Sequence, residues 1–119
     1  MAITINTQSR DFNEVEQYLM TLDRSIVSLK DVEDNTSIPV AGCLTFTDEK
    51  DNGDSVDILS IITPDNEVFS CQSATFKRSF DNILKIMHGK SFSIIKVSGT
   101  TKAGRPYIDC TLDVKAVKF

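Results

Sequence analysis

Two segments of the chain have apolar residues at helical spacing, and most of the rest alternates between apolar and polar positions as strands do. The first segment, residues 12–22, follows a possible capping box at Asp11 and Glu14. The second, residues 74–88, follows Ser73 as a potential N-cap and ends before Gly89. We therefore expect a short N-terminal helix and one well-formed central helix.

The alternating segments predict strands separated by turn-forming residues. In the last strand, the polar positions that alternate with its apolar ones include Tyr107, which is therefore expected to face outward. In the strand before it, a lysine within an apolar run favours Phe92 and Lys96 facing outward, with Ile95 and Val97 inward. The predicted strands span residues 25–32, 40–47, 55–62 with its hairpin extension 67–72, 91–98 and 107–114.

This order predicts a mainly β fold, a five-stranded Greek-key OB-fold barrel, with a helix between strands 3 and 4 and a short N-terminal helix. An SH3-like barrel or a small α+β sheet would fit the same order. The length of 119 residues, with no linker-like segment, indicates a single domain over residues 1–119. In an OB-fold, the loops after strands 1 and 4 flank the binding groove, here residues 30–39 and 99–106.

Charge is distributed unevenly along the chain. Residues 1–71 contain 4 Lys/Arg and 14 Asp/Glu, whereas residues 72–119 contain 9 and 3, so an overall charge of −4 conceals a basic second part. Such asymmetry is a feature of polyanion-binding proteins, although folding can also interleave the two parts.

The composition gives little support to other chemistry. Cys43, Cys71 and Cys110 lack the spacing of a zinc site and are expected to be buried free thiols, and His88 is the single histidine. We expect no cofactor and no metal. No apolar run approaches the length of a membrane span and no secretion signal is evident, which predicts a cytoplasmic protein without membrane contact.

The loop GTTKAGRPY, residues 99–107, contains two cations, two glycines and an aromatic residue but no carboxylate. Single-stranded nucleic acid requires cations for its phosphates and aromatic rings for base stacking. Lys102 and Arg105 could supply the cations, and Tyr107 and Phe92 the rings. Lys90 and Lys96 complete the candidate set. Alternatively, Lys102 is simply solvated, Arg105 pairs with Asp109 or Asp57, and Tyr107 caps the barrel end.

The segment from Thr75 to Leu112, together with DILSIIT at residues 57–63, resembles the small single-stranded DNA-binding proteins of phages of Gram-positive bacteria, in particular lactococcal siphophages. The similarity is most specific in GTTKAGRPYIDC, residues 99–110. It implies an OB-fold and largely sequence-independent binding of single-stranded DNA during phage DNA replication or recombination. It also implies a homo-oligomer that meets host or phage recombination and replication proteins.

One feature departs from the cellular single-stranded DNA-binding proteins, which end in a flexible acidic tail that recruits partners. This chain ends in LDVKAVKF, with a terminal phenylalanine but no acidic stretch, so the resemblance does not extend to such a tail.

Two other functions fit parts of the sequence. A protein-interaction barrel without nucleic-acid binding would use the acidic first part of the chain. A nuclease would need the carboxylates between Asp48 and Asp57 to hold Mg²⁺, but this run has the composition of a solvated hairpin tip, and we expect no enzymatic activity.

Overall fold

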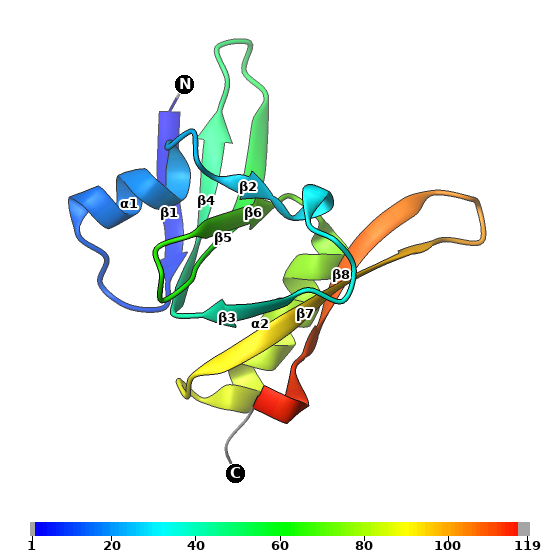
Figure 1. Ribbon diagram of the computed structural model, residues 1–119. Coiled ribbons are helices and arrows are strands. Elements are labelled where there is room, and N and C mark those ends of the chain that lie inside the picture. Colours follow the sequence, from blue (N-terminus) through cyan, green and yellow to red (C-terminus); the bar gives the residue numbers. More distant parts are fainter. Residues whose placement is uncertain (1, 117–119) are drawn as a thin grey trace.

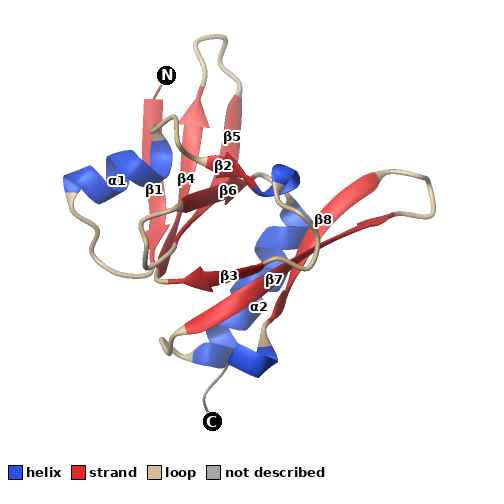
Figure 2. Ribbon diagram, viewed as in Figure 1, coloured by secondary structure: helices blue, strands red, loops and turns tan. Residues whose placement is uncertain are grey.

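The computed structural model describes residues 2–116 and shows a mainly β architecture with two α-helices (Figures 1 and 2). The C-terminal residues Lys118 and Phe119, compared above with an acidic tail, lie outside the described residues. The strands are β1 (Ala2–Gln8), β2 (Val27–Ser28), β3 (Ser37–Val40), β4 (Gly42–Glu49), β5 (Ser55–Ile62), β6 (Val68–Cys71), β7 (Phe92–Thr100) and β8 (Pro106–Leu112). The helices are α1 (Glu14–Thr21) and α2 (Ala74–Met87), with short 3-10 turns η1 (Leu29–Asp31) and η2 (Val114–Ala116).

The strands form two sheets. The larger has the order β1-β4-β5-β6-β2, antiparallel except for the parallel β2–β6 pair, and the smaller has the order β3-β7-β8. Only Ala41 separates β3 from β4, so one nearly continuous segment belongs to both sheets. Over residues 2–116, β6 and β8 are not paired, and the barrel expected from the sequence is not closed.

Two hydrophobic cores lie on opposite faces of the larger sheet. The main core gathers side chains of both sheets, such as Cys43, Leu59 and Ile94, around α2. The second lies under α1, where Leu44, Phe46 and Ile62 pack against Phe12 and Met20. The larger sheet is therefore apolar on both faces, because successive residues of a strand point to opposite sides.

Helix α2 forms as its sequence predicts. The hydroxyl of Ser73 accepts a hydrogen bond from the Phe76 backbone N–H at 3.2 Å. Phe76, Phe80, Ile83 and Met87 are buried along one side of the helix. The helix ends at His88, which has a left-handed φ of 50°, and Gly89 follows with φ of +82°. The expected range of 74–88 is thus confirmed to within one residue.

Four local predictions are wrong, one of them the polar loop expected at residues 30–39, whose last three residues belong to β3. Residues 2–8 form β1, an edge strand not expected from the sequence. Residues 25–32 contain only the two-residue β2 followed by η1, because the Ser28 hydroxyl accepts a hydrogen bond from the Lys30 N–H and turns the chain. The capping box of α1 uses Asn13 and Glu16 rather than Asp11 and Glu14.

Candidate nucleic-acid interface

The β7–β8 hairpin projects from the body of the protein and carries the predicted binding loop at its end (Figure 1). Its ladder pairs Gly99 with Tyr107 and Thr100 with Pro106. The backbone then pairs once more, since the Thr101 N–H donates to the Arg105 carbonyl at 2.8 Å. Gly104 has φ of +84°, a conformation that favours glycine, so this residue makes the tight turn possible.

The cations Lys102 and Arg105 are both exposed at this turn. Within residues 2–116, neither side chain has an ion pair. The alternative pairing of Arg105 is not observed: Asp109 Oδ1 accepts the Cys110 N–H, and Asp57 Oδ1 accepts the Thr47 hydroxyl. Arg105 directly precedes β8 and is two residues from Tyr107.

Tyr107 is 39% exposed, which confirms its expected outward orientation. Its ring reaches across the ladder to Gly99, so that a Cβ at residue 99 would lie 2.6 Å from the tyrosine Oη. The hairpin therefore presents an exposed aromatic side chain two residues from an exposed cation. This is the combination that stacks a base and neutralises the adjacent phosphate.

The expected orientation of Phe92 and Lys96 is wrong, because both point into the protein. Phe92 is 9% exposed and packs against Phe80, with ring centroids 6.0 Å apart. Lys96 is 4% exposed, and its Nζ donates to the Val32 carbonyl at 2.7 Å and to Asp34 Oδ1 at 3.0 Å. These two acceptors compensate a buried charge that would otherwise be costly.

Lys96 instead holds the loop after η1 against β7. The Asn35 N–H donates to the Lys96 carbonyl, and the Lys96 N–H donates to the Thr36 carbonyl. Asp34 Oδ2 also accepts a hydrogen bond from the Ser98 hydroxyl at 2.6 Å. The Ser98 hydrogen bond and then the Lys96 ammonium lower the pKa of Asp34 below its usual range. The loop is thereby fixed at the base of the hairpin.

A hollow of about 530 Å³ lies at this base and is lined by Lys30, Ser73, Lys96, Ser98 and residues 106–108, Tyr107 among them. A smaller hollow of about 230 Å³, lined by Ser28, Ile58 and residues 70–72, shares Lys30 with it. Lys30 is exposed in η1. No local sequence pattern singles out Lys30, because its position depends on how η1 packs.

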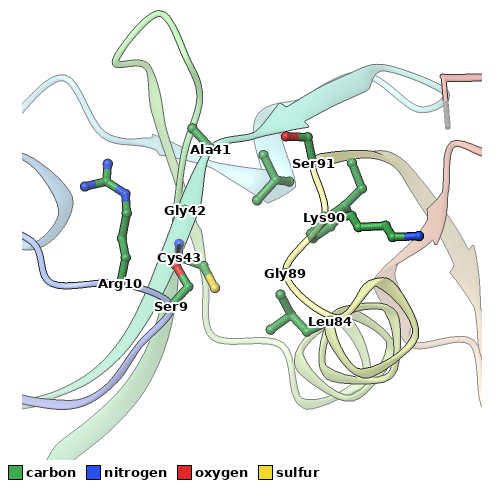
Figure 3. A pocket seen from close by; sticks show the side chains of 11 residues that line it. Ser9, Arg10, Ala41, Gly42, Cys43, Leu84, Gly89, Lys90 and Ser91 are labelled. Atoms are coloured by element: carbon green, nitrogen blue, oxygen red, sulfur yellow. Dashed lines mark hydrogen bonds between the residues drawn. The ribbon is translucent and has the colours of Figure 1, made fainter. Parts of the chain in front are cut away.

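Lys90 precedes β7, at the end of this strand opposite to the hairpin turn. It lines a separate pocket of about 280 Å³, where the turn after α2 faces the bend between β3 and β4 (Figure 3). The other cation of this pocket, Arg10, is engaged with Glu16 at 2.9 Å and lies 4.4 Å from the centre of the Phe12 ring. The structure does not bring Lys90 together with Lys102, Arg105 and Tyr107.

Comparison with protein-family models, curated proteins and solved structures found no match.

The three cysteines are free and buried, as expected. Burial raises the pKa of all three thiols, to about 11 for Cys71 and about 12 for Cys110. In the described part of the chain, no three His, Cys, Asp or Glu side chains gather into a potential metal site. Neither α-helix within residues 2–116 has the length and hydrophobicity needed to cross a bilayer.

Proposed function

We propose that this protein binds single-stranded DNA with little sequence preference through the β7–β8 hairpin and the adjoining surface around Lys30. The observation that carries the proposal is the exposed Tyr107 of a projecting hairpin, two residues from the exposed Arg105 and close in sequence to the exposed Lys102 of the same turn. Aromatic stacking tolerates any base, and phosphate contacts carry no sequence information, so binding of this kind is largely independent of sequence.

The strand order supports an OB-fold that is open on one side. If β3 and β4 are counted as one bent first strand, the spatial order becomes β6, β5, β4/β3, β7, β8, with α2 between the third and fourth strands. An OB-fold barrel has this order and is often partly open. The loops flanking its groove are then residues 50–54 and 101–105, and the first of these replaces the segment 30–39 expected from the sequence.

The biological setting that we propose is coating of single-stranded DNA during phage DNA replication or recombination, with contacts to host or phage proteins of these processes. We also propose that the protein is a homo-oligomer. The larger sheet ends at β1, whose outer edge pairs with no strand of the described chain and is open to strand pairing. Light scattering coupled to size-exclusion chromatography tests this directly, and a monomer at all concentrations would contradict it.

The function is tested by fluorescence anisotropy of a labelled oligo-dT titrated with protein at several salt concentrations, beside a duplex of equal length. We expect binding to the single strand and weaker binding to the duplex. The slope of log affinity against log salt concentration should be about −0.7 for each phosphate neutralised. Absence of binding at low salt, or an affinity independent of salt, would overturn the proposal.

Two variants test the location of the site. Arg105→Glu and Tyr107→Ala should each weaken binding by about tenfold, since one stacked base contributes roughly 1–3 kcal/mol and a charge reversal replaces attraction by repulsion. Lys90→Glu is the matched control, an exposed lysine at the other end of β7. If Lys90→Glu weakens binding as much as Arg105→Glu, the effect reflects net charge rather than a site on the hairpin.

A second candidate function, a protein-interaction module, is favoured by α1. Its outer side exposes Val15 by 76%, Tyr18 by 54% and Leu22 by 47%, at positions that share one helix face. Exposed apolar stripes of this kind are a feature of protein contacts. A protein that shifts no oligonucleotide at low salt would favour this function over DNA binding.

A further inference from the structure

Gly99 is the residue over which the hydroxyl end of the Tyr107 ring lies. A Cβ at position 99 would approach Tyr107 Oη to 2.6 Å, Cζ to 2.7 Å and Cε1 to 3.0 Å, all closer than non-bonded atoms normally come. Any side chain at this position would thus displace the ring from where it lies.

The reason for glycine here is space and not backbone conformation. Gly99 lies within the regular β7–β8 ladder and is not among the glycines with positive φ. Gly104 in the turn is the opposite case, with φ of +84° and nothing within 4 Å of a Cβ. The two glycines of the loop therefore have different roles: Gly104 shapes the turn, and Gly99 makes room for the ring.

We propose that Gly99 is a positioning residue for base stacking, which holds Tyr107 along the hairpin in the orientation that receives an unpaired base. This inference rests on the proposed DNA-binding function and names the part of the ligand that Tyr107 contacts. A ring already ordered in the free protein loses less rotational freedom when a base stacks on it, which strengthens binding. The remaining exposed part of the ring, in a residue that is 39% exposed, is available to the base.

The test is the variant Gly99→Ala, measured with two strands of equal length and charge, oligo-dT and an abasic oligomer. Affinity for oligo-dT should fall about threefold to tenfold, the range for ordering one side chain on binding. Affinity for the abasic strand should not change, because phosphate contacts do not involve the ring. Thr100→Ala is the control, since this neighbouring residue lies on the opposite face of the same strand.

A double-mutant cycle separates positioning of Tyr107 from a general effect on the sheet. In a Tyr107→Ala background, Gly99→Ala should have no further effect on oligo-dT binding. If the Tyr107 ring only covers a glycine of the sheet and has no role in binding, Gly99→Ala would lower stability in urea. The two substitutions would then show no such coupling in their effects on affinity. Additive losses, equal losses for both strands, or unchanged affinity for oligo-dT would each overturn the inference.

A measurement on the unaltered protein keeps the proposal testable if Gly99→Ala does not fold. The Tyr107 ring should displace the Hα resonances of Gly99 from their ordinary positions in the NMR spectrum, and the displacement should disappear in Tyr107→Leu. Hα resonances at ordinary positions would overturn the placement of the ring even if DNA binding is found. Failure of the unaltered protein to bind either strand would instead overturn the proposed function, and the inference with it.

Discussion

Lys96 is the one charged residue that is buried within residues 2–116, and it shows how a single side chain organises the base of the hairpin. Its ammonium is held by the Val32 carbonyl and by Asp34, whose carboxylate is half exposed. Because an ammonium group without partners is costly to bury, loss of Asp34 should be more harmful than loss of the lysine charge itself. The pair therefore positions the loop after η1 rather than contributing a free cation to the surface.

The lowered pKa of Asp34 predicts a pH dependence of stability. A carboxyl whose pKa is lower in the folded than in the unfolded protein stabilises the fold above its unfolded pKa, and this contribution is lost as pH falls through its folded pKa. In urea denaturation, Asp34→Asn should be less stable than the unaltered protein near pH 7. The difference should shrink as the pH is lowered below about 4, the usual range of aspartate.

Asp65→Asn provides the control for this comparison, because Asp65 is exposed in the turn between β5 and β6 and forms no ion pair within the described chain. Its urea midpoint should follow that of the unaltered protein at every pH. A difference for Asp34→Asn that stays constant from neutral to acidic pH would contradict the role given to the carboxylate charge.

At the level of elements, local signals predicted α2, β5 and the β7–β8 hairpin, because each has its own periodicity and end signals. β1 was missed because an edge strand is defined by distant pairing, here from Ala2 opposite Glu49 to Gln8 opposite Leu44. Residues 25–32 alternate like a strand, but β2 has only two residues paired with β6 before Ser28 turns the chain. The strand propensity of a segment does not show whether a partner strand is present.

The residues of the candidate site were likewise predictable only where a local pattern determines their orientation. Tyr107 faces outward because the alternation in β8 leaves only one apolar face for the core. In β7 both faces contain apolar residues, so the choice between Phe92 and Ile95 depends on the side on which α2 packs. The burial of Lys96 depends on Asp34, 62 positions away in the sequence. Neither relation is visible in a local pattern.

Ser73 connects α2 to β8 and leads to a prediction at the element scale. Its hydroxyl accepts the Phe76 N–H at 3.2 Å and donates to the Ile108 carbonyl at 3.3 Å. Ser73→Ala should lower the free energy of unfolding by about 1 kcal/mol, the usual cost of losing an N-cap. Urea denaturation followed by circular dichroism measures this change.

Ser79→Ala is the matched control in the interior of the same helix, where serine caps nothing. Because alanine is the better helix former, this variant should change stability by less than about 0.5 kcal/mol or raise it slightly. Equal losses for the two serines would show that the Ser73 cap does not contribute as its geometry indicates.

On the scale of the whole molecule, the charge asymmetry of the sequence becomes a contrast between two projecting hairpins (Figure 1). The β4–β5 hairpin carries Glu49, Asp51 and Asp54 against a single Lys50, whereas the β7–β8 hairpin turn carries Lys102 and Arg105. A strand bound along the surface between them would be attracted at one end and repelled at the other. The acidic hairpin would thus limit binding without touching the DNA.

This arrangement predicts that Glu49→Gln raises the affinity for single-stranded DNA. At about 0.01 M salt, where the screening length is about 30 Å, a gain of roughly twofold is expected, and it should disappear near 1 M, where that length is about 3 Å. The slope of log affinity against log salt concentration, measured at moderate salt, should change little, since no contact between a cation and a phosphate is gained or lost.

Glu14→Gln on α1 makes the same change in net charge at a site away from both hairpins (Figure 1). If position matters, Glu14→Gln should raise affinity less than Glu49→Gln at low salt in the same anisotropy titration. Equal gains would mean that the DNA responds to the net charge of the protein alone. In that case the surface between the hairpins would not be the path of the strand, although Arg105 and Tyr107 could still bind it locally.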